Sequence, residues 1–193
     1  MKTLFDHIVN WMIDQGEITR EDKELYIYAI QSIVLTVSPI FLALAIGVVM
    51  RCPGRSVLVI LPFALIRKFS GGYHAKSALV CLIASVMLII GCVSLTYLLE
   101  DSVFVLVLTG FAIIGMGLLS PVDHENRRLS AREKRSFKIT AIIITLVFYF
   151  SAVGFFVFKK RIIATCFCVG ILLAAILQYP AYIRKHREDR QGE

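Results

Sequence analysis

Residues 78–99 read ALVCLIASVMLIIGCVSLTYLL, and the stretch before them, residues 67–77, reads RKFSGGYHAKS. The first stretch is an unbroken apolar run of the length that a membrane-spanning helix needs, roughly 20 residues. The second is a short polar segment with a glycine pair, a histidine and several basic residues. In lipid, an apolar run such as residues 78–99 satisfies its backbone hydrogen bonds by forming an α-helix. The two stretches therefore predict a membrane helix that follows a polar segment at the membrane surface.

The remainder of the chain has the same character. It has 193 residues, of which 58% are hydrophobic, and a mean hydropathy of +0.76. A soluble domain of this length is nearer half apolar. Because the excess lies in long runs, we predict an all-α fold, a polytopic helical membrane protein in which residues 1–193 form one domain. Acidic residues throughout residues 1–25 interrupt any apolar core of a cleaved signal peptide.

We expect about six membrane segments. They are Ile27–Met50, Val57–Ile66, Ala78–Leu99, Val103–Leu119, Ile139–Phe158 and Ile162–Ile183. As a helix, Val57–Ile66 covers only about 15 Å. This segment is either a short crossing or a re-entrant segment, and both readings stay open.

The two ends of the chain are predicted to lie outside the hydrocarbon. Residues 1–25 form an amphipathic N-terminal region, in which Leu4, Phe5, Ile8, Trp11 and Met12 share one helical stripe suited to the membrane interface. The next helix is expected to begin near Arg20, with Thr19 as its cap. Residues 184–193 are expected to form a cytoplasmic tail.

The net charge of +7 points to the membrane rather than to nucleic acid, because the basic residues cluster at 127–138 and 184–190, beside apolar runs. The connection 100–102 has no Lys or Arg and is therefore expected outside. This orientation places the segment 67–77 and both basic clusters on the cytoplasmic side. It leaves Lys159–Arg161 outside, against the charge rule.

Cys81 and His74 are the candidate catalytic pair, because a thiolate nucleophile and a base are the minimum parts of a thiol enzyme. With Ser77 as an N-cap, Cys81 falls near the start of the apolar helix. The positive end of the helix dipole, together with Arg67, Lys68 and Lys76, would favour its thiolate.

The spacing of the pair imposes a structural condition. In one continuous helix His74 and Cys81 would share a face but lie roughly 10 Å apart along the axis, too far for proton transfer. His74 must therefore lie in a non-helical segment that folds back toward Cys81, and Gly71 and Gly72 supply the freedom for that reversal. An interfacial histidine and a packing cysteine are the simpler alternative.

A second polar cluster follows Leu119 and is expected on the same side of the membrane. Asp123, Glu125 or Asn126 would orient His74 as a third member, and His124 is an alternative base. A solvated loop is the simpler reading. The basic residues that follow would bind anionic lipid or an acidic peptide; they are Arg127, Arg128, Arg132, Lys134 and Arg135.

No cofactor and no metal are expected. No third Cys or His has zinc-ligand spacing, and Cys166 and Cys168 point to opposite faces of a helix. These two cysteines and Cys92 are most simply small apolar residues.

Taken together, Arg67, the stretch Phe-Ser-Gly-Gly-Tyr-His-Ala at 69–75, Cys81 and the later Pro121…Asn126-Arg127-Arg128-Leu129 resemble the accessory gene regulator B (AgrB) family of membrane peptidases. The length, hydrophobic layout, amphipathic N-terminus and basic middle loop also agree, so the resemblance covers nearly the whole chain.

The resemblance implies a membrane cysteine endopeptidase of Gram-positive quorum sensing. Cys81 would attack a peptide bond near the C-terminal side of a small propeptide, with His74 as base and then acid. An internal Cys of the propeptide would then intercept the thioester to form a thiolactone, or a Ser a lactone. The implied partners are an amphipathic propeptide with an acidic C-terminal region, the lipid bilayer and a second copy of the chain, for which Gly110, Gly115 and Gly117 would allow close helix contact.

Two other functions remain open at this point. A non-enzymatic peptide transporter would use the segment 67–77 as a binding site at a broken helix. An enzyme acting on lipid headgroups would need several carboxylates on adjacent helices, and the apolar runs hold almost none.

Overall fold

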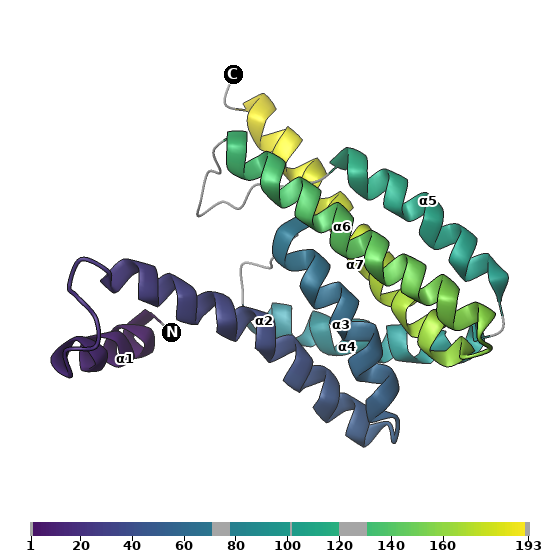
Figure 1. The fold of residues 1–193 in the computed structure, drawn as a ribbon, viewed down its shortest axis with the longest axis horizontal. Coiled ribbons are helices and arrows are strands. Elements are labelled where there is room, and N and C mark those ends of the chain that lie inside the picture. The colour runs from purple at the N-terminus through teal and green to yellow at the C-terminus, as the bar shows by residue number, and fades with distance from the viewer. Residues whose placement is uncertain (1, 71–77, 101, 120–130, 192–193) are drawn as a thin grey trace. The chain divides into compact units, whose positions relative to one another are not determined.

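A computed structural model describes residues 2–70, 78–100, 102–119 and 131–191, and Figure 1 shows their arrangement. Regular structure in these ranges is helical throughout, which confirms the all-α prediction. The helices are α1 (Lys2–Asp14), α2 (Lys23–Val49), α3 (Pro53–Ser70), α4 (Ala78–Leu98), α5 (Val103–Leu119), α6 (Ala131–Val157) and α7 (Arg161–Gln191). They form two compact units, residues 1–39 and residues 40–193; the second is called the helical bundle below.

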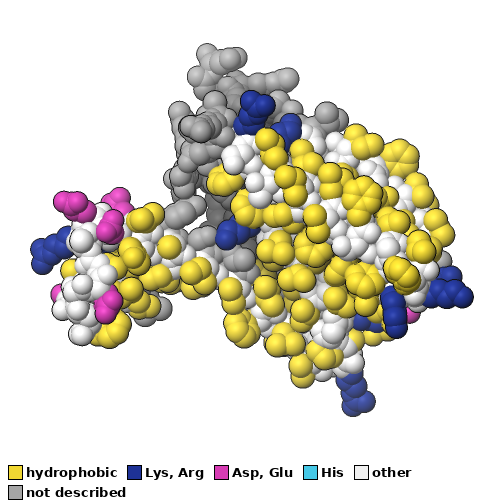
Figure 2. Space-filling model, in the orientation of Figure 1, with side chains coloured by type: hydrophobic (Ala, Val, Ile, Leu, Met, Phe, Trp, Pro, Cys, Tyr) yellow, Lys and Arg dark blue, Asp and Glu magenta, His cyan; other side chains and the backbone are white. Residues whose placement is uncertain are grey.

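Two stretches among the described residues are both long and apolar enough to cross a membrane, Arg135–Val157 and Arg161–Tyr179. Shorter apolar helices cover Val37–Val49, Leu82–Leu98 and Val103–Gly117. Large apolar side chains such as Met87, Phe111 and Phe150 are exposed along α4, α5 and α6. Hydrophobic side chains cover most of the face of the bundle that Figure 2 shows. Water-soluble proteins rarely expose so broad an apolar surface, so this face suits lipid.

The apolar runs predicted some helix boundaries well and others poorly. α5 coincides with the predicted Val103–Leu119, and α4 ends one residue before the predicted Leu99. α3 has 18 residues and is about 27 Å long, nearly twice the predicted segment. The apolar run underestimated α3 because polar and basic residues occupy its first and last turns. Whether α3 crosses or re-enters stays a prediction.

Other boundaries also differ from the sequence-based ones. α7 continues to Gln191, so most of the predicted tail 184–193 is helical. α2 begins at Lys23 rather than near Arg20. The Thr19 hydroxyl donates to the Asp22 carboxylate (Oγ1 to Oδ2, 2.7 Å), just before the first turn of α2.

Helix α1 shows part of the predicted amphipathic pattern. Phe5 is buried, and so is Val9, which the predicted stripe did not include. Ile8 and Trp11 are exposed, with Trp11 at 63% of its full accessible area. An exposed tryptophan beside an exposed isoleucine is what an interfacial helix would offer to lipid headgroups. The position of α1 in the interface stays a prediction.

α7 is the central helix of the bundle and packs against α3, α4, α5 and α6. Two-thirds of its stretch Arg161–Tyr179 is buried, against 17% of Arg135–Val157 in α6. At the closest approach, Gly170 of α7 lies on the backbone of α3: a Cβ there would overlap the Val59 carbonyl oxygen and come within 2.6 Å of Pro62 Cγ. Only glycine allows this distance between the two helix axes.

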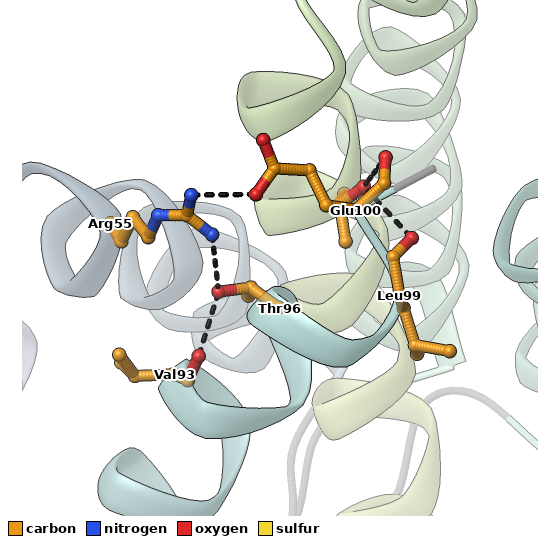
Figure 3. A network of polar contacts seen from close by, with 6 residues as sticks. Arg55, Val93, Thr96, Leu99 and Glu100 are labelled. Carbon is orange, nitrogen blue, oxygen red and sulfur yellow. Dashed lines mark hydrogen bonds and ion pairs between the residues drawn. The ribbon is translucent and has the colours of Figure 1, made fainter. Parts of the chain in front are cut away.

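A polar network closes one end of the bundle (Figure 3). Arg55 Nη2 of α3 donates to Glu100 Oε2 at 2.6 Å, and its Nη1 lies 3.5 Å from Thr96 Oγ1. The Arg55 guanidinium also lies 3.9 Å from the centroid of the Tyr97 ring. The Thr165 hydroxyl of α7 donates to the carbonyls of Leu99 and Glu100. We call this end of the bundle the Arg55 end.

These contacts fix the direction of α3 relative to α7. Near the starts of both helices, Arg55 and Thr165 meet the same residue, Glu100. Further along, Val59 and Pro62 meet Gly170. The two helices therefore run side by side in the same direction, as Figure 1 also shows. Their C-terminal halves point toward the opposite end of the bundle.

Two of the three glycines assigned to contact between chains have neighbours within the chain. A Cβ at Gly110 would lie 3.2 Å from the Tyr149 hydroxyl, and one at Gly115 would lie 2.9 Å from that of Tyr179. Gly117 has open space. Gly110 and Gly115 therefore have tyrosine neighbours in α6 and α7 of the same chain, and their role between two copies stays a prediction. The homodimer itself stays a prediction.

The Gly170 contact gives a test of the packing. Gly170→Ala should cost about 1–3 kcal/mol, because the methyl group overlaps the α3 backbone. Gly154→Ala is the matched control: nothing lies within 4 Å of a Cβ at that helical position, so the substitution should be neutral or slightly stabilising. Thermal unfolding of both variants in detergent measures the difference. Equal midpoints for the two variants would contradict the close approach of α3 and α7.

Candidate functional site

The predicted catalytic segment lies between α3 and α4. Arg67 is in the last turn of α3, and Cys81 is the fourth residue of α4, which is described from Ala78. His74, Gly71 and Gly72 lie outside the described residues. Residues 71–77, before Ala78, lie outside the described residues, so the expected place of Cys81 near a helix start stays a prediction. The fold-back of His74 stays a prediction.

The second predicted cluster lies between α5 and α6. Asp123, His124, Glu125, Asn126, Arg127 and Arg128 lie outside the described residues. Arg132, Lys134 and Arg135 belong to the first turns of α6, and the Arg135 side chain is exposed. Their predicted roles in orienting His74 and in binding the substrate stay predictions.

One aromatic contact brings the edges of these two clusters together. The rings of Phe69, in the last turn of α3, and Phe137, in α6, meet edge to face with centroids 6.0 Å apart. The end of α3 and the start of α6 are therefore neighbours, although the sequence separates them by more than 60 positions. α4 begins at this same end, since its other end reaches Arg55. We call it the Cys81 end.

Basic residues mark the Cys81 end. The half-buried Arg67 has its guanidinium 5.4 Å from the centroid of the Phe63 ring, and the Lys68 ammonium lies 6.0 Å from that of Phe69. Arg135 and Lys138 lie near the start of α6. Beneath these charges the end of α3 is buried at Ile66 and Ser70. Such an arrangement attracts an anionic ligand to a surface that continues into a tightly packed interior.

Gln178 is the residue that sequence reasoning missed. It is fully buried on α7, and neither its Oε1 nor its Nε2 has a hydrogen-bond partner among the described residues. A signal existed in the sequence, since an uncharged amide inside the apolar run Ile162–Ile183 is unusual. The helix face it occupies was not readable without the packing of α3 on α7.

A cavity of about 10 Å³ lies between α5 and α6, lined by residues that include Met116 and Thr145, and it has room for one water at most. Across the part of the chain that the structure describes, no three side chains of His, Cys, Asp or Glu gather closely enough to hold a metal ion.

Comparison with protein families gives a match over most of the chain. The model of the family described as Accessory gene regulator B matches residues 5–178. The matched range includes α3, the segment between α3 and α4, Cys81 and the start of α6.

Curated proteins give matches of the same kind. The chain is 31% identical over 136 residues to the accessory gene regulator protein B of Staphylococcus saprophyticus, a match that covers 67% of each protein. It is 24% identical over 154 residues to putative AgrB-like protein 2 of Clostridium perfringens, covering 68% of this chain and 71% of that protein. It is 29% identical over 133 residues to a putative AgrB-like protein of Listeria monocytogenes, covering 66% of this chain and 65% of that one. No solved structure matches the chain significantly.

Proposed function

Because this chain belongs to the accessory gene regulator B family of quorum sensing, we propose that it is a membrane cysteine endopeptidase that cleaves and cyclises a small propeptide. The observation that carries the proposal is the family match across residues 5–178. The position of Cys81 also supports the proposal. Cys81 lies in the first described turn of α4, at the end of the bundle where α3 and α6 meet. A helix N-terminus favours a thiolate over a neutral thiol.

The proposed chemistry has two acyl transfers. The Cys81 thiolate attacks the carbonyl carbon of a peptide bond on the C-terminal side of the propeptide. The carbon–nitrogen bond breaks, the C-terminal fragment leaves as an amine with a proton from His74, and the rest is held as a thioester on Cys81. His74 then removes the proton from an internal thiol of the propeptide, and that sulfur attacks the thioester. The ring closes as a thiolactone, and Cys81 leaves as a thiolate.

Exclusion of water is what makes the second step productive. A thioester exposed to water is lost to hydrolysis, whereas one bounded by lipid and packed helices persists until the internal nucleophile arrives. The apolar surface of α4 to α6 and the buried end of α3 support such an environment. A propeptide with Ser in place of the internal Cys would give a lactone by the same route.

The remaining site residues have supporting roles in this proposal. Gly71 and Gly72 allow the turn that brings His74 to Cys81, and one of Asp123, Glu125 and Asn126 orients the imidazole. Arg67 either braces this segment or binds a substrate carboxylate. The basic residues from Arg127 to Arg135 receive the acidic part of the propeptide.

We also propose the setting of the reaction. The protein is a multi-pass protein of the bacterial cell membrane, and the Cys81 end faces the cytoplasm, since basic residues gather in the sequence between α5 and α6 and in the first turns of α6. Two copies form the working unit. Lys159 and Lys160 would then lie on the outer side, in the short turn between α6 and α7 where Lys159 has a positive φ of 59°.

Cys81→Ala tests the nucleophile. We expect complete loss of cleavage of a test propeptide with normal membrane insertion. The test propeptide is a synthetic peptide with an amphipathic leader, one internal Cys and an acidic C-terminal segment, taken from the short reading frame beside the gene. Cleavage is followed by mass spectrometry on protein in liposomes.

Cys92→Ala is the matched control, because Cys92 lies on the same helix, about 16 Å further along. It should cleave at the wild-type rate. A Cys81→Ala variant that still cleaves would sink the peptidase proposal and favour the peptide transporter.

Charge-neutral variants test the basic residues at the start of α6. Arg132, Lys134 and Arg135 changed together to Gln should raise KM by about tenfold or more at low salt, and by less at high salt, because ionic screening already weakens the wild-type attraction. The quantity measured is KM at several salt concentrations.

The control for this triple variant is Lys159→Gln with Lys160→Gln at the other end of α6, about 40 Å away. It should leave KM unchanged. An unchanged, salt-independent KM in the triple variant would contradict the docking of an acidic segment there.

A further inference from the structure

Gln178 differs from the other buried polar side chains of the bundle. The hydroxyls of Thr96, Thr109 and Thr145 each donate to a carbonyl of their own helix at 2.7 Å. The amide of Gln178 is as deeply buried, yet its donor and acceptor atoms have no partner among the described residues. Buried polar groups are nearly always paired, so an unpaired amide in a packed interior needs an explanation.

The packing of α7 shows which way Gln178 faces. Ile171, Ala174 and Ala175 are buried in the same cluster as Ile60, Phe63 and Ile66 of α3. Gln178 lies three and four residues beyond Ala175 and Ala174, and seven beyond Ile171, so it continues the same face of α7. The same cluster includes Ile89 and Val93 of α4 and Met116 of α5, so this face packs among α3, α4 and α5.

The register of the two helices gives the level of Gln178. Gly170 lies against Val59 and Pro62, and α3 and α7 run in the same direction. Gln178 lies eight residues beyond Gly170 on α7. On α3, the residues eight positions beyond Val59 and Pro62 are Arg67 and Ser70. At about 1.5 Å per residue, Gln178 therefore lies about 12 Å from the Gly170 contact, level with the last turn of α3. The chain continues from Ser70 directly into the segment that contains His74.

A primary amide has a definite partner chemistry. It offers two N–H donors and one carbonyl acceptor, which complements the C=O and N–H of a peptide group. A peptide that enters a site bounded by lipid and packed helices loses the water that satisfied its backbone, so the site must replace those hydrogen bonds. An amide left unpaired by the fold is able to do so.

We propose that Gln178 is a substrate-binding residue whose amide hydrogen-bonds a backbone peptide group of the propeptide at the Cys81 end. This inference rests on the proposed peptidase function. Gln178 would give the site a group on α7 that recognises the peptide backbone. This group is separate from the candidate catalytic pair, His74 and Cys81, and from the basic residues of α6. Because the contact is to backbone, it holds the peptide in register without selecting its side chains.

Gln178→Leu is the decisive variant, since leucine is of similar size and removes both unpaired polar atoms. If the fold provides no partner, the substitution should leave the midpoint of thermal unfolding unchanged or raise it. On the background of Cys81→Ala, which binds without cleaving, it should weaken the affinity for the fluorescently labelled test propeptide at least about tenfold, the loss of roughly one buried hydrogen bond. With Cys81 present, kcat/KM should fall by a similar factor.

Thr109→Val is the matched control, because the Thr109 hydroxyl is equally buried but bonded to Val105 within α5. It should not change the affinity for the test propeptide. Unchanged affinity in Gln178→Leu would overturn the inference. A lowered unfolding midpoint or failed insertion would overturn it too, since either result shows that the amide is bonded within the fold. If the peptidase proposal itself fails, the protein with Gln178 unchanged shows no Cys81-dependent cleavage. This result distinguishes failure of the peptidase proposal from failure of the Gln178 inference.

Discussion

The close approach of α3 and α7 at Gly170 is the contact on which the rest of the bundle depends. Without a side chain at that position, the Val59 carbonyl and the Pro62 ring rest on the α7 backbone. The contact sets the distance between the two helices and, because helices rise by a fixed amount per residue, the level of every later residue on each. The end of α3, where the candidate catalytic segment begins, is positioned by this register.

The two ends of the bundle use their charges differently. At the Arg55 end the guanidinium is matched by Glu100, the Thr96 hydroxyl and the Tyr97 ring, so its charge is used to join α3 to α4. At the Cys81 end the Arg67 guanidinium lies near the Phe63 ring and the Lys68 ammonium near the Phe69 ring, in the last turns of α3. The first arrangement joins α3 to α4, and the second places basic side chains over aromatic rings at the end of α3.

The sequence predicted the fold where hydrophobicity alone determines structure. The described bounds of α5 and α4 lie within one residue of the predicted apolar runs, since both helices consist almost entirely of apolar residues. α3 was underestimated because polar and basic residues occupy its first and last turns, among them Arg55, whose partner Glu100 lies 45 positions away. The place of Gly110 and Gly115 also depended on partners in other helices, Tyr149 and Tyr179. Distant pairings of this kind leave no periodic signal in the sequence.

The sequence predicts a chemistry for the candidate site, which stays a prediction, and it does not predict the role of every buried residue near that site. A cysteine near a helix start, with a histidine and a glycine pair before it, is a local pattern that single-sequence reasoning can find. Gln178 could not be assigned in this way, because its significance comes from being buried, unpaired and level with the end of α3. These three properties depend on the packing of two helices that residues 71–160 separate in the chain.

The central claim is that Cys81 carries the propeptide as a thioester. Intact-protein mass spectrometry after rapid acid quenching of protein mixed with the test propeptide measures this directly. The thioester mechanism predicts an adduct whose mass equals that of the propeptide without its C-terminal fragment. Hydroxylamine should release this adduct, and peptide mapping should locate it on the peptide that contains Cys81. The adduct should accumulate when the internal Cys of the propeptide is changed to Ala. Cleavage that proceeds with no adduct on Cys81, or with an adduct on Cys92, would contradict it.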